Sequence, residues 1–388
     1  DYRCSGNDLI NNHLTFFLFH HAELFEPEEW PEGITVMGMG LLEGEAMSSS
    51  KGHVVLPTEA IEEYGADTVR FFLLNAAEPW QDYDWRADAV ESVRDQLAAF
   101  VERADAVAGL DAPDADVAVD ESGEPVLETP DGETRSLSGP DRWLLSRLQH
   151  VIGEVTDALE EFETRRASQE AFFRFEEDLR WYRRRADLDR PAARWVRRTV
   201  LRARLRLLAP FVPFLTNELH EALTGEPAED ADWPTVDERL ESTRAEVEEE
   251  LVESLVDDVR EVVQVTGTEP ETVHVYSAAG WKQRVLDAVV EVGPDRGAVM
   301  GTVMDDPDLR ERGDAVNDLV GSLVESVRGR DDAALAALAD LDETAVYEGA
   351  ADFLGAEFDA EIRVVPEDET GDEKATQAEP LRPAIRLA

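Results

Sequence analysis

The feature that most constrains the fold is a succession of apolar residues at helical spacing between residues 88 and 225. One stripe consists of Val90, Val93, Leu97, Phe100, Val101 and Ala104. A second stripe alternates spacings of three and four, and consists of Leu145, Leu148, Ile152, Val155, Leu159 and Phe162. Apolar helix faces of this kind are stable when they pack against one another. The pattern therefore predicts a helical bundle.

The regions on either side of this bundle have a different pattern. Residues 1–86 are aromatic-rich, with a strand-like segment at 34–39, a loop and two short helices, which predicts an α/β arrangement. In residues 245–388, helices alternate with short strands, which predicts a small α+β module. We therefore expect domains at 1–86, 87–244 and 245–388. Residues 111–140 are acidic and rich in proline and glycine, and we expect a solvated loop there.

The balance of charge is strongly acidic. The sequence has 87 acidic and 37 basic residues, a net charge of −50, and three of the basic residues are lysine. Self-repulsion of this size opposes a compact state, but at molar salt the Debye length falls to about 3 Å and screens it. The composition is typical of a protein from the cytosol of an extreme halophile. It does not exclude a nucleic-acid partner.

Several common classes of site and location are not indicated. No apolar run reaches membrane-spanning length, and the start at Asp1 has neither an initiator methionine nor a signal-peptide pattern. We therefore expect a cytoplasmic protein without a membrane partner, whose chain begins in mid-protein. Cys4 is the single cysteine, and no cysteine and histidine set has metal-ligand spacing, so no metal site is predicted.

A glycine-rich and serine-rich loop follows the first predicted strand. It has glycines at 38, 40 and 44 and then reads Met-Ser-Ser-Ser-Lys-Gly at 47–52. The spacing does not match a P-loop, which needs Gly-Lys-Ser/Thr four residues after its first glycine. A helical segment with Tyr-Gly-Ala-Asp-x-x-Arg follows at 64–70.

In this order, these segments resemble the class I aminoacyl-tRNA synthetases. The loop at 46–52 is similar to their second signature, Lys-Met-Ser-Lys-Ser. "SGNDLINNH" at 5–13 is similar to the family's Gly-x-Asp segment, and "DYDW" at 82–85 to the segment leading into the helical bundle. The longer stretch at 5–25 and the tail "KATQAEPLRPAIRLA" at 374–388 resemble leucyl-tRNA synthetases of the archaeal and eukaryotic-cytosolic type.

The resemblance implies a fold and a reaction. The fold would be the second half of a Rossmann-type catalytic domain, an anticodon-binding-type helical bundle and a C-terminal module that contacts the elbow and variable arm of tRNA-Leu. The reaction would use ATP with Mg²⁺ to attach leucine to tRNA-Leu. The implied catalytic residues are Met47, Ser48, Ser49, Ser50 and Lys51. The implied ATP-binding residues are Gly6, Asp8, His13, Gly38 and Met39.

The sequence departs from this family in two ways. Ala46 and Ser49 stand where the second signature has lysines, and the loss of such a cation costs on the order of 10²-fold in rate. Lys51 either compensates or, as we favour, occupies the place of the family's third lysine. The first signature, of His-Ile-Gly-His type, and the inserted editing domain have no match in the chain. We therefore expect no leucyl-adenylate synthesis by this chain alone, and a missing N-terminal half.

Asp8 has two interpretations. Its carboxylate suits the hydroxyls of a ribose, with Gly6 allowing close approach of the backbone and His13 lining the same pocket. Alternatively, Asn7 or Asp8 caps the N-terminus of the helix that follows. With the resemblance, ribose binding is the favoured interpretation.

An arginine-rich segment between residues 174 and 206 indicates an RNA surface independently of the resemblance. It holds twelve arginines against five acids, next to Trp181, Tyr182 and Trp195. Arginine binds phosphates through two parallel hydrogen bonds and stacks on bases. The residues predicted to bind tRNA are Arg180, Arg183, Arg184, Arg185, Arg194, Arg197 and Arg198. The alternative is an exposed helix whose arginines pair with acidic neighbours.

Three functional hypotheses remain. The first is a fragment of a leucine-tRNA ligase, inactive alone. The second is a non-catalytic synthetase paralogue that binds tRNA. The third, an acidic helical scaffold, would leave the ordered motifs as coincidences. For Trp281 and Lys282 in the C-terminal module, core packing is favoured over docking to RNA.

Overall fold

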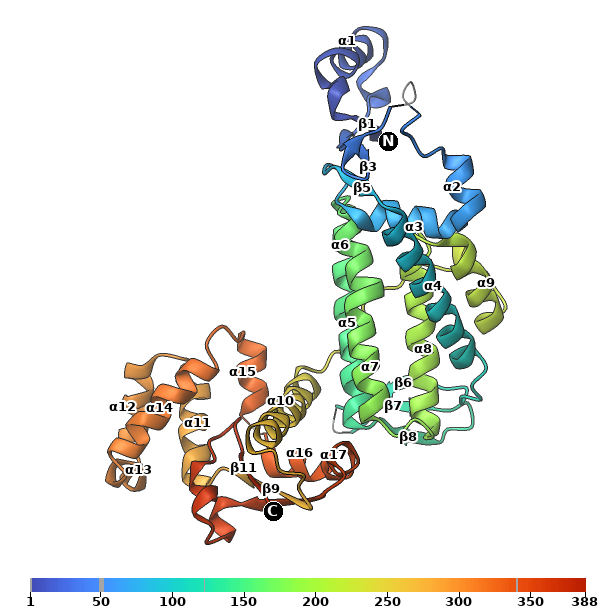
Figure 1. The fold of residues 1–388 in the computed structure, drawn as a ribbon. Coiled ribbons are helices and arrows are strands. Elements are labelled where there is room, and N and C mark those ends of the chain that lie inside the picture. The colour runs from blue at the N-terminus through green and yellow to red at the C-terminus, as the bar shows by residue number, and fades with distance from the viewer. Residues whose placement is uncertain (1, 49–51, 122, 340) are drawn as a thin grey trace. The chain divides into compact units, whose positions relative to one another are not determined.

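The computed structural model describes residues 2–48, 52–121, 123–339 and 341–388 (Figure 1). Its contacts divide the chain into two compact units. The first comprises Asp1–Leu137 and Arg147–Leu240, and the second comprises Ser138–Ser146 and Glu241–Ala388. Within the described ranges, no helix combines the length and apolar character needed to cross a membrane.

The first unit begins with short strands and helices. In chain order these elements are β1 (Tyr2–Gly6), α1 (Thr15–Leu24), β2 (Gly33–Met37), β3 (Gly40–Leu42), β4 (Glu45–Ala46), α2 (Pro57–Tyr64), α3 (Ala66–Ala76) and β5 (Tyr83–Trp85). β1 and β2 are parallel, and β3 lies between antiparallel β4 and parallel β5. Gly65 separates α2 from α3 with a φ of +88°, a backbone conformation that glycine adopts without strain.

The predicted helical bundle is confirmed. Its helices are α4 (Ala87–Ala108), α5 (Gly139–Glu160), α6 (Thr164–Ser168), α7 (Phe175–Arg185), α8 (Pro191–Leu208) and α9 (Pro213–Thr224). Both predicted stripes supply core residues, among them Val90, Leu97, Leu148 and Val155, which are all buried. A cluster of aromatic rings links the bundle to α3, where Phe71 packs against Phe172 with 4.9 Å between ring centroids.

The prediction of a solvated loop at 111–140 is wrong. The segment forms an antiparallel sheet of β6 (Asp116–Val119), β7 (Pro125–Glu128) and β8 (Thr134–Ser136). Leu127, in the central strand, is fully buried. Gly123 and Gly132 lie in the turns with φ of +89° and +82°. The acidic residues face outward, and their abundance hid three short strands whose apolar positions are few.

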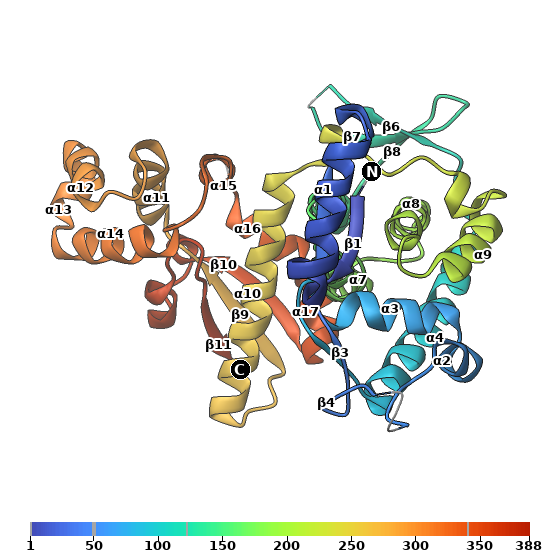
Figure 2. The ribbon, with the colours of Figure 1, turned by 90° about the horizontal axis from the view of Figure 1, so that it is seen from above.

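The second unit is an α+β module. Its central strand β9 (Thr272–Ser277) pairs with parallel β10 (Glu361–Pro366) and antiparallel β11 (Ala384–Leu387). Its helices are α10 (Thr243–Thr266), α11 (Gly280–Val292), α12 (Arg296–Asp305), α13 (Pro307–Glu311), α14 (Asp314–Ser326), α15 (Asp332–Leu338), α16 (Glu343–Gly349) and α17 (Ala351–Phe358). Figure 2 shows this unit from a second direction.

Lys282 belongs to the core of this module. The residue is 6% exposed, and its ammonium donates hydrogen bonds to the carbonyls of Thr376 and Ala378 and pairs with Glu367 at 2.8 Å. The core-packing interpretation of Trp281 and Lys282 is confirmed for the lysine.

Candidate functional site

The ends of β1 and β2 bring together part of the predicted nucleotide site. The parallel register places Gly6 opposite Met37, so the residues after both strands emerge at the same edge. A Cβ on Gly6 would lie 2.7 Å from Asp8 Oδ1 and 3.9 Å from Met39 Sδ. The carboxyl ends of parallel strands are where α/β proteins bind their ligands. Gly6, Asp8 and Met39 therefore share one location suited to a ligand.

The helix-cap alternative for Asp8 does not match the geometry. The short 3-10 helix Asn7–Leu9 has Gly6 at its N-cap position, without a side-chain capping bond. The following turn, Ile10–Leu14, likewise has no side-chain cap. Asp8 is exposed, and its carboxylate remains available as an acceptor. His13 is exposed as well and lies 3.4 Å from Arg3, between Nε2 and a guanidinium nitrogen.

Gly38 and the backbone beyond it are held by the segment at 82–85. A Cβ on Gly38 would lie 2.1 Å from the carbonyl oxygen of Gln81, so a larger residue does not fit. The N–H of Met39 donates to Asp82 Oδ1 at 2.7 Å, and the N–H of Gly44 donates to Asp84 Oδ1 at 2.8 Å. The two aspartates thus fix the strand that leads into the loop.

The loop itself is closed at its base. Ser48 and His53 exchange backbone hydrogen bonds of 2.7 and 3.1 Å, and the His53 ring contacts the carbonyl of Leu42 at 3.0 Å. Met47 and Ser48 are half-buried, whereas Ala46 is exposed. The remaining predicted catalytic residues, Ser49, Ser50 and Lys51, lie outside the described residues.

The Tyr-Gly-Ala-Asp-x-x-Arg segment joins the N-terminal elements to the bundle. The Asp67 carboxylate accepts hydrogen bonds from the backbone N–H groups of Leu215 and Phe214, in the first turn of α9. Burial raises the pKa of Asp67, while these two hydrogen bonds act in the opposite direction. Arg70 donates to the carbonyl of Pro210 at 2.8 Å. This motif contributes to the resemblance in sequence, but the sequence does not predict that it connects the N-terminal elements to the bundle.

A second joint lies at the end of α3. Glu78 accepts hydrogen bonds from the backbone N–H groups of Arg165 and Arg166, at 3.2 and 3.0 Å. These groups lie in the first turn of α6, where a helix has N–H donors without internal partners. A sequence pattern predicts a helix cap only when the capping residue directly precedes the helix. Glu78 is far from α6 in the chain, so the sequence gives no sign of this contact.

The arginines between 174 and 206 divide into two groups. Arg180, Arg184 and Arg202 are exposed, and Arg185 and Arg194 are half-buried. The Nε atom of Arg194 is buried and has no hydrogen-bond partner among the described residues.

Four of the other arginines, Arg183, Arg197, Arg198 and Arg204, are directed inward. Arg204 is 4% exposed and pairs with Glu176 at 2.8 Å, and Arg183 donates to the same carboxylate at 3.0 Å. Arg198 donates to the carbonyls of Ala108, Leu110 and Leu223, and Arg197 is half-buried. The sequence predicts RNA contact for seven of the twelve arginines. The structure places three of these seven, Arg183, Arg197 and Arg198, in intramolecular surroundings.

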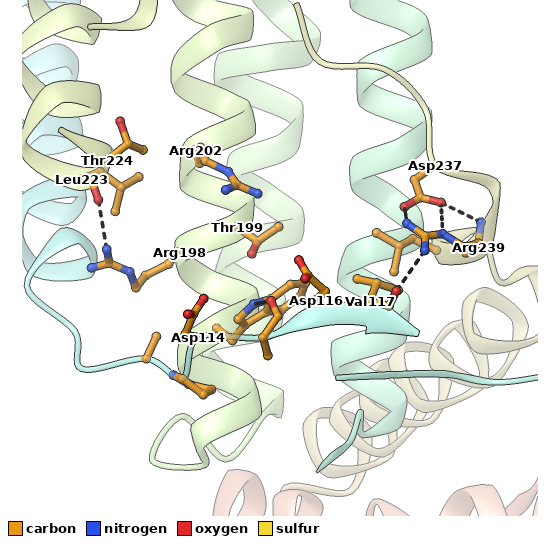
Figure 3. A pocket seen from close by; sticks show the side chains of 15 residues that line it. Asp114, Asp116, Val117, Arg198, Thr199, Arg202, Leu223, Thr224, Asp237 and Arg239 are labelled. Atoms are coloured by element: carbon orange, nitrogen blue, oxygen red, sulfur yellow. Dashed lines mark hydrogen bonds and ion pairs between the residues drawn. The ribbon is translucent and has the colours of Figure 1, made fainter. Parts of the chain in front are cut away.

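Arg198 lies at one end of a pocket of about 770 Å³. Figure 3 shows its guanidinium turned toward the Leu223 carbonyl, while Arg239 binds Asp237 and the Val117 carbonyl at the opposite end. Arg202 is exposed and lines the same pocket. The walls carry both arginines and aspartates, so the pocket as a whole is not a strong attractor of anions.

Comparison with known proteins places these features in a family. Residues 2–104 match the class I tRNA synthetases (M), and residues 141–275 match the anticodon-binding domain of tRNA ligase. The chain is 39% identical over its full length to the leucine-tRNA ligase of Methanothermobacter thermautotrophicus, and 39% identical over 99% of its length to that of Pyrococcus abyssi. It spans 40% and 37% of the length of these two relatives.

The likeness to solved structures is weaker. A ternary complex of Agrobacterium radiobacter K84 agnB2 LeuRS with tRNA and LeuAMS matches 80% of this chain and 34% of that chain, with 21% identity and a TM-score of 0.49. The sequence relationship carries the assignment. Since the similarity over the length of this chain and both domain matches agree, the chain belongs to the leucine-tRNA ligase family of class I aminoacyl-tRNA synthetases.

Proposed function

We propose that this chain is the second-signature and tRNA-binding portion of a leucine-tRNA ligase, which attaches leucine to tRNA-Leu with ATP. Residues 1–86 would be the C-terminal half of the catalytic Rossmann domain. Residues 87–244 would be the tRNA-binding helical bundle, with the inserted sheet inside 111–140, and residues 245–388 would be a C-terminal tRNA-binding module.

The observation that carries the proposal is an uncovered apolar surface beside the nucleotide edge. No residue of α1 is buried, and Phe16, Phe19 and Leu24 are 63%, 68% and 69% exposed. Among the described residues, the adjoining parallel sheet has two strands, β1 and β2. Parallel sheets are normally larger and covered on both faces. This surface supports a further Rossmann half, which would carry the first signature and cover α1.

The residues at the strand ends fit the ribose of ATP better than its phosphates. Asp8 offers a carboxylate acceptor for ribose hydroxyls, with Gly6, His13, Gly38 and Met39 around it. The phosphates would face the loop of Met47, Ser48, Ser49, Ser50 and Lys51. ATP supplies the activated phosphate as a substrate, with Mg²⁺. This chain's contribution is to position the adenosine and to offer hydroxyl donors to the pyrophosphate.

The tRNA surface of the bundle would be formed by the outward arginines. We assign this role first to Arg180 and Arg184, whose side chains are exposed, and then to Arg185 and Arg194, which are half-buried. Directed arginine contacts are needed here, since the net charge of −50 repels a polyanion at long range and salt weakens counterion release. The same charge supports function in the cytosol of a halophile.

A second candidate function is that of a non-catalytic tRNA-binding paralogue. Ala46 favours it: this residue is exposed on β4, at a position where the family has a lysine. A lysine there would reach solvent and the phosphates without any repacking, so its absence removes a cation that the structure accommodates.

Leucine-dependent ATP–pyrophosphate exchange at molar KCl decides between the two. The protein encoded by the complete locus is compared with its Ala46→Lys and Ser49→Lys double variant, and tRNA-Leu binding is measured in the same preparation. Exchange with binding, raised at least about tenfold by the two lysines, supports the ligase. Binding without exchange in both proteins supports the paralogue. Absence of both overturns the proposal.

A further inference from the structure

A crevice inside the helical bundle has a charge imbalance that the tRNA proposal does not use. Residues of α4, α7 and α8 line it, and it encloses about 140 Å³. Figure 1 labels these three helices. The charged residues that line it are Arg103, Arg183, Arg197, Arg204 and Glu176. Four cations therefore surround one carboxylate, in a chain whose overall charge is strongly negative.

The carboxylate is already fully engaged. Glu176 Oε2 accepts from Arg204 at 2.8 Å, and Oε1 accepts from Arg183 at 3.0 Å and lies 3.4 Å from Arg103. Burial alone would raise the pKa of Glu176, but these arginines outweigh it and hold that pKa below its usual range. Glu176 remains an anion and has no further capacity to neutralise a fourth cation.

Arg197 is that fourth cation. It is half-buried on α8 and forms no hydrogen bond or ion pair with any residue that the structure describes. Burial lowers the pKa of its guanidinium, Tyr182 acts in the opposite direction, and the positive charge of Arg183 lowers the pKa further. A cation in such surroundings is stabilised by an opposing charge, and the one carboxylate that lines the crevice, Glu176, is already bound by Arg183 and Arg204.

The rest of the crevice is apolar. Its lining side chains include Phe100, Val107, Leu179, Val200 and Leu201. A volume of about 140 Å³ exceeds the share of one liquid water, about 30 Å³, several-fold. Such a crevice has room for a small apolar body next to the charged head that Arg197 requires. A hydrated inorganic ion would leave the apolar wall in contact with water.

We propose that this crevice binds a small organic anion, with its carboxylate on Arg197 and Arg103 and its apolar body against Phe100, Val200 and Leu201. Arginine matches a carboxylate through parallel hydrogen bonds. Arg204 serves a different purpose: its guanidinium is occupied by Glu176 and by the carbonyls of Ala171 and Phe172, so it fixes the floor of the site.

The test uses benzoate and 3-methylbutanoate as probes, titrated into the protein at constant molar KCl by calorimetry. Benzamide has the apolar ring of benzoate without its charge, and inorganic phosphate has a negative charge without an apolar body. We expect the two carboxylates to bind, and benzamide and phosphate to bind at least about tenfold more weakly, because hydrogen bonds to charged groups contribute more than a factor of ten. Equal binding of benzamide and benzoate would overturn the proposal.

Variants localise the binding. Arg197→Gln should weaken benzoate binding at least about tenfold, and Arg103→Gln, at a more exposed position, should weaken it severalfold. Arg94→Gln, at an exposed position on α4 that does not line the crevice, is the matched control and should leave it unchanged. Circular dichroism establishes whether each variant is folded. If Arg197→Gln does not fold, Arg103→Gln still tests the site.

RNA is the competing occupant. If neither carboxylate binds while Arg197→Gln and Arg103→Gln weaken tRNA-Leu binding, the crevice serves a backbone phosphate and the proposal fails. If benzoate binds and a saturating amount of tRNA-Leu does not displace it, the small-anion site is separate from the RNA surface, as we expect.

Discussion

The carboxylate of Asp67 accepts the backbone N–H of Leu215 at 2.7 Å, across 148 residues of sequence. This bond and its neighbour to Phe214 supply partners for two amides at the start of α9, which have none within their own helix. Helix caps of this kind usually come from the residue next to the helix. Here the cap comes from α3 and therefore also joins the N-terminal elements to the bundle.

Replacing this carboxylate should loosen the joint. We expect Asp67→Ala to lower the free energy of unfolding by about 1–2 kcal/mol, the range measured for lost N-caps. Chemical denaturation in molar KCl measures it. Asp105→Ala, at an exposed position on α4, is the control and should change little. An equal loss in both variants would show that Asp67 acts only through net charge.

Lys282 should be among the residues most sensitive to substitution in the second unit. Lys282→Met keeps the apolar stem but leaves Glu367 and the carbonyls of Thr376 and Ala378 without their cation. Breaking a buried pair from one side costs about 3–5 kcal/mol. Lys374→Met removes a hydrogen bond to Gln377 near the surface, so its effect on the unfolding midpoint should be much smaller.

The stability of the second unit should depend on pH through Glu343. Burial raises the pKa of this carboxyl to about 7, while the N–H of Leu381 donates to it. Because the folded pKa lies above the unfolded value, the folded state holds the proton more tightly. The contribution of Glu343 to stability is highest below about pH 4.5 and is lost as the pH rises through about 7.

Glu343→Gln isolates this contribution, because the amide is neutral at every pH. At pH 8 the variant should be more stable than the wild type by up to about 3 kcal/mol, and the difference should vanish near pH 4.5. Unfolding curves of both proteins across this range measure it. A difference independent of pH would mean that Glu343 is ionised throughout.

Gly38 should tolerate no side chain. A Cβ there would overlap the carbonyl of Gln81 at 2.1 Å, and this carbonyl belongs to the backbone, which has little freedom to move. Gly38→Ala should therefore separate β3 from the segment at 82–85 and increase amide exchange of Met39 and Tyr83. Gly139→Ala is the control, since a Cβ there meets nothing within 4 Å.

Binding of tRNA should distinguish the outward arginines from the inward ones. Arg180→Ala and Arg184→Ala should each weaken tRNA-Leu binding severalfold and reduce the slope of log K against log salt by about one. Arg174→Ala, where the arginine pairs with Glu170, should have a smaller effect. Fluorescence anisotropy at several KCl concentrations gives both quantities. Unchanged slopes would place the RNA surface elsewhere.

The sequence predicts those parts of the structure whose signal is periodic. The stripes containing Val90 and Leu148 are buried as expected, because a bundle core imposes its spacing on the sequence. The inserted sheet around Leu127 gave no such signal, since each of its strands has three or four residues and the acids between them dominate the composition.

The direction in which a side chain points is harder to predict from sequence than the helix to which it belongs. The sequence predicts that Arg198 binds tRNA, yet Arg198 turns toward backbone carbonyls. Arg204, in the same segment, is buried against Phe100, where its guanidinium lies 5.0 Å from the ring centroid. A count of charges does not reveal which face of a helix each one occupies. Asp8 and the loop remain predictions, because a nucleotide site is defined by groups that the sequence alone does not bring together.

Three hydrogen bonds attach the inserted sheet to its neighbours through the sheet's own main-chain carbonyls. Trp195 donates to the carbonyl of Ala115, Arg239 to that of Val117, and Arg190 to that of Ser136. A carbonyl is present whatever the side chain, so mutations at these three positions leave the attachment intact as long as the backbone keeps its path. The insertion is therefore free to diverge in evolution at these three positions, whereas the fully buried Leu127 is not.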